Sequence, residues 1–278
     1  MKRRLTTAAC ALIALIAGAG PASAQHPGAN GEKAYGWDGT GLAAPCLSGV
    51  PMDEWTPYNI VPDGTARSAM AFSASGRYLA ISGASGESEG LYVVDTVNCY
   101  PPRLIGPRAE GASWSPDGKQ LAVERDGDVV VISPSTGAVL RNLTPGTPGT
   151  VEANPSWNPK GGTVAYEAPD GVRTVPAGGG RSTLVARDAV DPDYSPDGTR
   201  LAWIRGSDQH ITIADTRGRG AKATPISAYT FTWSPDGTSF LFVGYAGEPD
   251  CLVATTRGRI TERIGGAPCG PVAWQPIR

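Results

Sequence analysis

The stretch that decides the fold is GASWSPDGKQLAVE, residues 111–124. In its SPDG core, Pro presets the backbone angle at the second position of a tight turn, Asp tolerates the third, and Gly accepts the left-handed conformation that follows. Apolar residues alternate after the turn, at Leu121 and Val123, as they do in a half-buried β-strand. The segment therefore predicts a β-hairpin whose first strand carries an aromatic residue, Trp114.

The same block recurs along most of the chain. Further copies begin at Ala69, Asn154, Asp191 and Thr230, and a partial copy, PVAWQPIR, occupies residues 271–278. The aromatic residue ahead of the turn recurs every 37–43 residues, at Phe72, Trp114, Trp157, Tyr194, Trp233 and Trp274. A period of about 40 residues is typical of one four-stranded blade of a β-propeller. The sequence predicts an all-β, six-bladed β-propeller made of four-stranded antiparallel blades.

Shorter strands are expected to complete each blade. Third strands should start at Leu91, Asp128, His210 and Cys251, and fourth strands at Val139, Ser182 and Arg259. The sixth repeat supplies only a first strand, so its other strands are expected around residues 33–37, 42–47 and 58–61. In the resulting single domain, residues 25–278, segment 25–66 closes the ring by pairing with the C-terminal strand, and segment 67–278 holds the repeats. Such closure removes open sheet edges.

The SPDG block resembles the repeat of the TolB family, a WD40-like propeller repeat in which an aromatic residue precedes S-P-D-G. Three copies keep SPDG, starting at Ser115, Ser195 and Ser234, whereas the first and third repeats carry SASG and NPKG instead. The resemblance covers about residues 69–278 and implies the fold but no particular activity. TolB also has an α/β domain before its propeller. Residues 25–68 are too few for that domain, so we expect a propeller without it.

The N-terminus has the features of a bacterial signal peptide. Basic residues 1–4 are followed by an apolar run over residues 8–17 and by small residues at 22–24. The apolar run is shorter than the roughly 20 residues of a transmembrane helix. We expect cleavage near Ala24, a secreted or periplasmic protein, and no stable membrane insertion.

Composition and charge exclude several classes of function. The chain has 24 basic and 26 acidic residues, and loss of residues 1–24 removes only basic ones. A mildly acidic chain without a basic run argues against a nucleic-acid partner. The G-x-S-x-G nucleophile motif is missing, and two histidines, His26 and His210, are too few for a three-histidine zinc site. We expect a monomer with no cofactor, no metal and no catalytic constellation.

Four cysteines follow the signal peptide, namely Cys46, Cys99, Cys251 and Cys269. In an exported protein this number suggests two disulfides, although counting alone leaves three possible connectivities. The expected blade positions favour a bridge between Cys251 and Cys269 and a second between Cys46 and Cys99. The second bridge would hold the ring closed.

Two repeated residue types have a structural explanation. The turn aspartates Asp117, Asp197 and Asp236 recur because the turn recurs. The tryptophans Trp114, Trp157 and Trp233 hold the same position in every repeat, which favours packing between blades over a sugar-stacking role.

Binding residues are expected where the first strands and the loops before them converge, at the mouth of the central channel. The candidates are Arg67, Glu110, Glu152, Asn154, Asp188, Asp191, His210 and Tyr229. This mixture of acids with one arginine suits a cation, a basic peptide or a polar small ligand. Channel mouths filled with water are also polar without any ligand.

Two classes of function remain. The first is a non-catalytic module in the cell envelope or outside the cell that engages a protein or peptide partner through the channel mouth. The alternative is an extracellular lyase or hydrolase acting on a carbohydrate or a small ester, with or without calcium, in which Glu110, Glu152 and Asp191 serve as the acids. A carboxylate pair with shifted pKa values would favour the enzyme, and a flat apolar patch would favour the binding module.

Overall fold

The computed structural model describes residues 29–35, 70–83, 90–95, 97–98, 103–106, 109–146, 151–245, 251–264 and 272–277. These residues form β-strands and turns without a helix. This part of the chain accordingly contains no helix that could cross a membrane. The signal peptide, Arg67, Cys46, Cys99, Cys269 and the strands expected at 42–47 and 58–61 lie outside the described residues.

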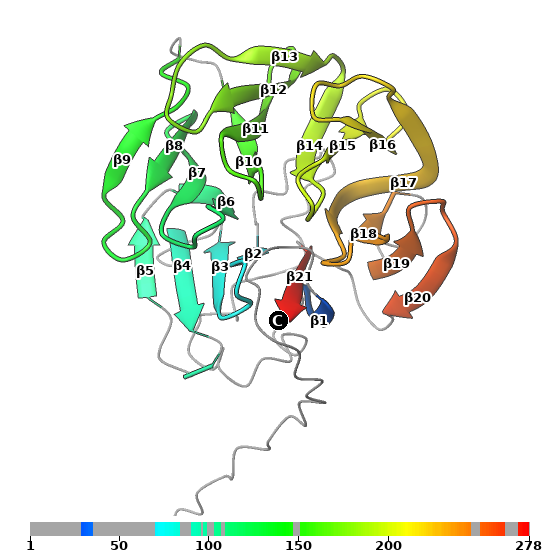
Figure 1. The fold of residues 1–278 in the computed structure, drawn as a ribbon, viewed down its shortest axis with the longest axis horizontal. Helices are drawn as coiled ribbons and strands as arrows, with labels where there is room; N and C mark the ends of the chain where they lie inside the picture. Colours follow the sequence, from blue (N-terminus) through cyan, green and yellow to red (C-terminus); the bar gives the residue numbers. More distant parts are fainter. Residues whose placement is uncertain are drawn as a thin grey trace, which may run out of the picture.

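Antiparallel sheets are arranged around a common centre (Figure 1). The first contains β2 (Met70–Phe72), β3 (Tyr78–Gly83), β4 (Gly90–Asp95) and β5 (Arg103–Gly106). The second contains β6 (Ala109–Trp114), β7 (Leu121–Arg125), β8 (Asp128–Ile132) and β9 (Val139–Asn142). The third contains β10 (Ala153–Trp157), β11 (Thr163–Ala168), β12 (Gly171–Pro176) and β13 (Thr183–Ala186). In each sheet the first strand lies nearest the centre and the fourth lies outside.

A seven-stranded sheet continues the ring. It contains β14 (Ala189–Tyr194), β15 (Arg200–Arg205), β16 (His210–Asp215), β17 (Lys222–Trp233), β18 (Ser239–Gly244), β19 (Cys251–Thr255) and β20 (Ile260–Ile264). The long strand β17 pairs with β16 through residues 222–227 and with β18 through residues 228–233. The sheet is therefore two four-stranded units that share one strand, the outermost of one unit and the innermost of the next.

The two ends of the described chain meet near the centre. β1 (Ala29–Tyr35) pairs antiparallel with β21 (Val272–Ile277), and Lys33 lies opposite Trp274. The sequence predicts this pairing of an N-terminal segment with the C-terminal repeat, although β1 begins earlier than the expected residue 33.

Most expected third and fourth strands begin within one residue of their predicted positions. The sequence analysis missed β5, β12 and the outer half of β17. The four residues of β5 are too short for a clear alternation, and residues 222–227 run into the next strand without a turn that would mark their end. Cys251, at the start of β19, is buried and disulfide-bonded. Its expected bridge to Cys269 stays a prediction.

The SPDG segments form the predicted turns. Each serine hydroxyl donates to the turn aspartate, over 2.7 Å from Ser115 to Asp117 and 2.6 Å from Ser195 to Asp197. The same Asp117 carboxylate accepts the backbone N–H of Lys119. The hydroxyl of Ser115 and then this N–H hold the pKa of Asp117 below its usual value. The turn aspartates thus stabilise turns, as the sequence analysis predicted.

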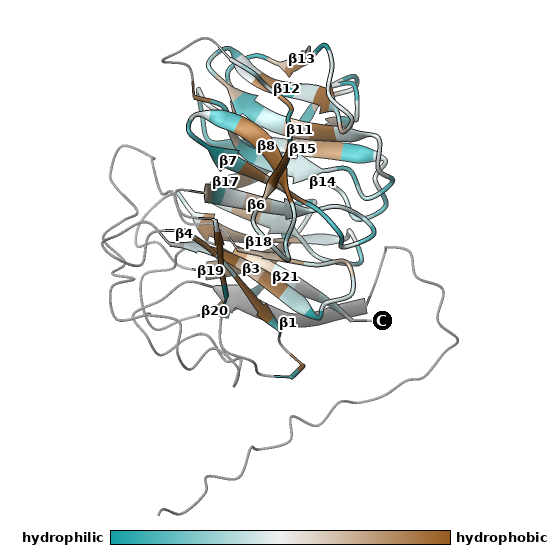
Figure 2. Cartoon of the chain, turned by 90° about the vertical axis from the view of Figure 1, so that its left-hand side faces the viewer, coloured by the Kyte–Doolittle hydropathy of each residue, from teal (hydrophilic) through white to brown (hydrophobic). Residues whose placement is uncertain are grey.

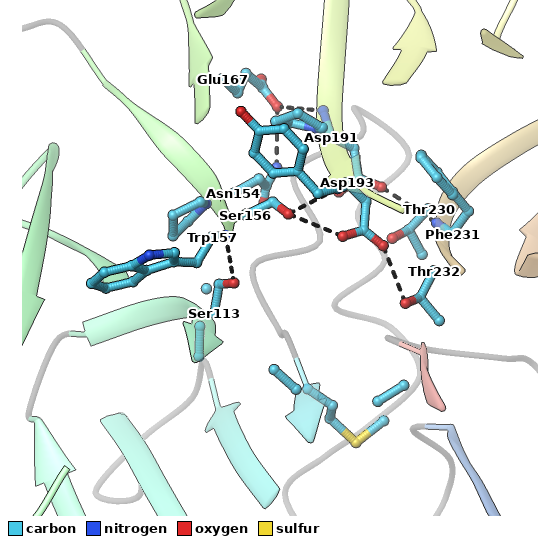
Figure 3. Close-up of a pocket in the computed structure, with 18 of the residues that line it drawn as sticks. Ser113, Asn154, Ser156, Trp157, Glu167, Asp191, Asp193, Thr230, Phe231 and Thr232 are labelled. Atoms are coloured by element: carbon cyan, nitrogen blue, oxygen red, sulfur yellow. Dashed lines mark hydrogen bonds between the residues drawn. The ribbon is translucent and has the colours of Figure 1, made fainter. Parts of the chain in front are cut away.

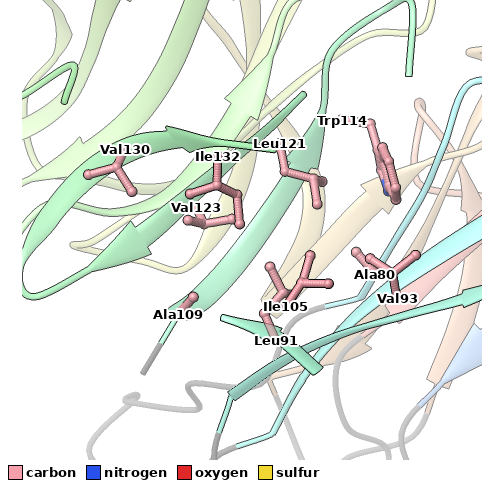
Figure 4. Packing of buried hydrophobic residues seen from close by; sticks show 10 residues of the cluster. All are labelled: Ala80, Leu91, Val93, Ile105, Ala109, Trp114, Leu121, Val123, Val130 and Ile132. Carbon is pink, nitrogen blue, oxygen red and sulfur yellow. The ribbon is translucent and has the colours of Figure 1, made fainter. Parts of the chain in front are cut away.

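The repeated aromatic residues lie between neighbouring units. Trp114, Trp157, Tyr194 and Trp233 are at most 8% exposed. The indole N–H of Trp114 donates to the carbonyl of Ala71 in the preceding unit over 3.0 Å. Figure 4 shows the apolar cluster beside it, in which Leu91 and Ile105 face Leu121 across the boundary. In Figure 2 the apolar segments lie within the strands, such as β8, β15 and β19.

The turn between β16 and β17 packs against β13 of the preceding unit. Gly218 has a φ of +78°, and a Cβ there would lie 2.5 Å from the carbonyl oxygen of Val185 in β13. Gly220, two residues on, has a φ of +68° with no atom within 4 Å of such a Cβ. The two glycines therefore share a left-handed backbone but differ in contact with the neighbouring unit.

We predict that Gly218→Ala destabilises the protein more than Gly220→Ala. The left-handed conformation alone costs about 1–2 kcal/mol for a residue with a Cβ, and Gly218→Ala adds a clash with a backbone oxygen that cannot move freely. Denaturant titration of both variants measures the difference in free energy of unfolding. Equal losses would show that the turn does not press on β13.

Candidate functional site

A cavity of about 660 Å³ lies at the centre of the ring. Its wall comes from the innermost strands β2, β6, β10, β14 and β21 and the inner half of β17. Figure 3 shows the side from which β10, β14 and β17 contribute their polar residues. The cavity occupies the place where the sequence analysis expects the channel mouth.

A bulge in three innermost strands shapes this wall. The pairing register of β6, β10 and β14 shifts just ahead of the aromatic residue. The residue three positions before that aromatic has a left-handed backbone in each strand, namely Gly111, Asn154 and Asp191. Glycine, asparagine and aspartate are the types that adopt this conformation most readily. A bulge of this kind re-aims side chains, and both Asn154 and Asp191 line the cavity.

The polar lining is acidic. Five carboxylates line the cavity, from Glu110, Glu124, Glu167, Asp191 and Asp193. Among the described residues that line it there is no lysine, arginine or histidine. Carboxylates of one sign gathered in a hollow create a strong local potential. The cavity therefore favours a positively charged group.

Asp191 is held by both neighbouring units. Its carboxylate accepts the backbone N–H of Phe231 over 3.3 Å, and its own N–H donates to Glu167 Oε2 over 3.2 Å. The same Glu167 oxygen accepts the side-chain amide of Asn154 over 3.1 Å. Burial, together with the charges of Glu167 and Asp193, raises the pKa of Asp191 to about 7. This carboxyl group therefore changes charge near neutral pH.

Asp193 connects three consecutive units. Its carboxylate accepts the hydroxyl of Ser156 over 3.0 Å and the hydroxyl of Thr232 over 3.3 Å (Figure 3). It also accepts the backbone N–H of Trp233 over 3.3 Å. Ser156 in turn accepts the N–H of Tyr194 over 3.0 Å. Burial raises the pKa of Asp193 to about 6, against the lowering effect of these donors. The Asp193 carboxyl group therefore connects neighbouring units by hydrogen bonds and, when ionised, places a negative charge at the cavity wall.

Four of the predicted site residues line the cavity, namely Glu110, Asn154, Asp191 and Tyr229. Glu152, Asp188 and His210 do not. Side chains alternate in direction along an extended segment, so Glu152 points away from the cavity while Val151 and Ala153 line it.

The other two residues belong to local structures outside the lining. The Asp188 carboxylate accepts the N–H of Ser207 over 3.0 Å, and its carbonyl accepts the N–H of Gly206. His210 Nδ1 lies 3.0 Å from the carbonyl oxygen of Asp208 in the preceding turn. Asp188 and His210 are therefore not among the residues that line the cavity with Asp191, and a part for them in binding stays a prediction. Glu152, the third predicted residue outside the lining, lies near Asp128. Burial and the negative charge of Asp128 raise the pKa of Glu152.

The sequence analysis missed Glu124, Glu167 and Asp193. Glu124 and Glu167 are the next-to-last residues of the second strands of their repeats, where two other repeats carry Ile204 and Val243. An acid at an otherwise apolar position of a repeat was the available signal. Asp193 stands directly before an aromatic residue and gave no signal of its own.

Within the described ranges, no three His, Cys, Asp or Glu side chains are arranged to hold a metal ion. The carboxylates of Asp191 and Asp193 accept hydrogen bonds from backbone and hydroxyl donors.

Solved structures with a similar fold include TolB from Acinetobacter baumannii, with a TM-score of 0.64 and 18% identity. That match covers 75% of this chain and 57% of the other, so the chain spans little more than half the length of that TolB. A TolB from Agrobacterium tumefaciens has a TM-score of 0.51 and 18% identity, covering 61% of this chain and 70% of the other. The fold is that of the TolB β-propellers. A nidogen/laminin complex also matches, with a TM-score of 0.62 and 10% identity over 76% of this chain and 86% of the other.

No protein-family profile and no curated protein matches the sequence. The likeness to TolB therefore concerns the fold alone, and the function has to be argued from the cavity.

We predict that mild acid stabilises the protein between pH 8 and pH 5. Asp191 and Asp193 titrate near pH 7 and pH 6 in the folded chain but near 3.9 when unfolded. The fold binds their protons more tightly, so stability rises as pH falls through these values and declines as pH rises through them. Thermal midpoints at pH 8, 7, 6 and 5 measure the effect, each kcal/mol corresponding to about 2–4 °C.

Asp191→Asn should flatten this pH dependence, because asparagine does not titrate and tolerates the left-handed backbone. Glu262→Gln, on the exposed outer strand β20, is the control and should keep it. The ion-paired Asp95 does not interfere, because Arg77, 2.7 Å away, holds its pKa well below its usual range. An unchanged slope in Asp191→Asn would contradict the assignment.

Proposed function

We propose that this protein is an exported, non-catalytic β-propeller module that binds a basic segment of a protein or peptide in its central cavity. The observation that carries the proposal is the lining of five carboxylates with no basic residue among the described lining residues. Charge complementarity of this kind steers association and selects partners. The acidic mature sequence fits a basic partner and argues against nucleic acid.

The shape of the site supports a peptide segment as the ligand. The cavity volume, about 660 Å³, falls in the range of sites that enclose a small ligand or a few side chains. The site lies on rigid strands rather than on loops, which favours a preformed receptor that loses little entropy on binding. The nidogen/laminin complex, matched above, is a complex of two proteins that includes a similar fold.

Several finer features belong to the same proposal. We propose six blades built from TolB-type repeats, with strands from residues 25–66 completing the sixth. Removal of residues 1–24 would release a monomer to the periplasm or the exterior, where bridges between Cys251 and Cys269 and between Cys46 and Cys99 would form.

A second candidate function is an extracellular lyase or hydrolase acting on a carbohydrate or a small ester. The raised pKa of Asp191, about 7, beside Asp193 favours it, since a carboxyl that titrates near neutral pH can act as a general acid or base. Against it, both carboxylates accept backbone N–H groups that tie neighbouring units. Turnover of a panel of glycosides and esters that Asp191→Asn abolishes would establish the enzyme.

For the binding function we predict that a basic decapeptide binds the protein and that an acidic decapeptide does not. The double variant Glu167→Gln with Asp191→Asn should lose at least about fivefold in affinity, because it removes two partly buried charges. Binding should also weaken as salt rises from 0.05 to about 0.5 M, where screening lengths fall to a few ångströms. Isothermal titration or fluorescence anisotropy measures both effects.

Glu262→Gln is the matched control, because it makes the same change of charge on an exposed outer strand. It should bind like the unmodified protein. Equal affinities for all three proteins would remove the cavity as the binding site. Equal affinity for acidic and basic peptides would refute the proposed basic ligand.

A further inference from the structure

Two exposed tyrosines contact each other, Tyr229 within β17 and Tyr245 directly after β18. The ring centroids of Tyr229 and Tyr245 are 4.7 Å apart with an angle of 46° between the planes. Tyr229 is 40% exposed and Tyr245 is 44% exposed. Four of the repeated aromatic residues, by contrast, are at most 8% exposed, namely Trp114, Trp157, Tyr194 and Trp233. Packing of the core therefore does not explain this pair.

A bulge sets the direction of Tyr229. The register of β17 against β18 shifts between Ala228 and Thr230, so Tyr229 stands outside the ladder. The backbone is fixed on both sides, since Ala228 N–H donates to Gln209 over 3.0 Å and Tyr245 N–H donates to Ser227 over 3.2 Å. Bulges that re-aim a side chain are frequent beside binding sites. The chain thus holds an aromatic surface rigidly at a wall of the cavity, which Tyr229 lines.

The aromatic pair adjoins the residues that hold Asp191. Thr230 and Phe231 follow Tyr229 directly, and both donate hydrogen bonds to the Asp191 carboxylate. Tyr229, Asp191 and Glu167 line the same cavity. Tyr245 is not among the lining residues and reaches the site through its ring contact with Tyr229. An aromatic ring and carboxylates that line one cavity form the combination that recognises an organic cation.

Other aromatic rings of the described chain already carry a cation from the same protein. The Arg77 guanidinium lies 5.0 Å from the ring of Tyr78, and that of Arg200 lies 4.6 Å from the ring of Trp233. Within the described ranges no such cation lies over Tyr229 or Tyr245. This chain uses arginine on aromatic faces, and among the described residues no arginine or lysine takes that place on the Tyr229–Tyr245 pair.

We propose that Tyr229 and Tyr245, together with Asp191 and Glu167, form a subsite for an arginine side chain of the bound segment. The inference rests on the proposed binding function and names the residue that the partner inserts. A guanidinium group fits better than an ammonium group, because it is planar, stacks on aromatic rings, pairs with carboxylates in a fork and is less strongly hydrated. The site therefore distinguishes arginine from lysine.

Three decapeptides of the same sequence, carrying arginine, lysine or citrulline at one central position, test this subsite. The unmodified protein should prefer arginine to lysine and bind the neutral citrulline peptide weakest. The double variant Tyr229→Leu with Tyr245→Leu should lose about five- to tenfold for the arginine peptide and most of the preference over lysine. The double variant Tyr229→Phe with Tyr245→Phe keeps both rings and should stay within about twofold of the unmodified protein.

The results distinguish a failure of the arginine subsite from a failure of the proposed binding function. If the leucine variant binds all three peptides like the unmodified protein while Glu167→Gln with Asp191→Asn still weakens binding, the subsite is wrong and the binding function stands. If neither variant changes binding, both proposals fail. Thermal midpoints verify the fold, and the single variant Tyr245→Leu, beyond the end of β18, serves where the double variant unfolds.

Discussion

One repeated hydrogen bond fixes how neighbouring units of the ring meet. The side chain directly before the aromatic residue of one unit accepts the backbone N–H of the aromatic residue in the next, with Ser113 accepting from Trp157, Ser156 from Tyr194 and Asp193 from Trp233. Apolar faces alone would allow the units to slide, because burial of apolar surface has no direction. These hydrogen bonds, buried at Ser156 and partly buried at Ser113 and Asp193, are directional and costly to break. They therefore set the register between the units that form the cavity walls.

The same positions explain why the cavity is acidic. A serine hydroxyl can make this tie without a charge, as Ser113 and Ser156 do. At Asp193 the acceptor is a carboxylate, which reaches Ser156, Thr232 and Trp233 at once. Two residues earlier, the bulge turns Asp191 toward the cavity as well. The ring thus contains two carboxylates at positions where neutral hydrogen-bond acceptors would hold the units together. Residues that stabilise the fold less well than an available alternative are expected at functional sites.

The fold was largely predictable because its determinants are local. A turn signal followed by alternating apolar residues specifies each hairpin wherever it occurs, as at Ser115 and Ser195. The outer half of β17 escaped prediction because two units share this strand without an intervening turn. Whether β17 continues from one unit into the next depends on how the two units are placed around the ring.

The site was less predictable because it depends on which way a side chain points. Asp191 was found from its distance to the aromatic residue. The same reasoning placed Glu152 at the cavity, where alternation turns its side chain away, and overlooked Glu167, which reaches the cavity from a second strand. The repeats predict that the first strands meet at the centre of the ring. The bulges in those strands determine which side chains face the cavity, and the sequence does not reveal them.

The raised pKa values of the cavity carboxylates connect the stability of the fold with the proposed binding. Raised pKa values for Asp191 and Asp193 mean that their ionised forms are unfavourable in the folded chain. A cation that enters the cavity stabilises those same ionised forms, so it must lower both pKa values and compete with protons for the carboxylates. The proposed ligand would therefore stabilise the fold most at neutral and alkaline pH, where the ionised carboxylates destabilise it most. A binding site built from structural ties can in this way depend on its ligand for part of its stability.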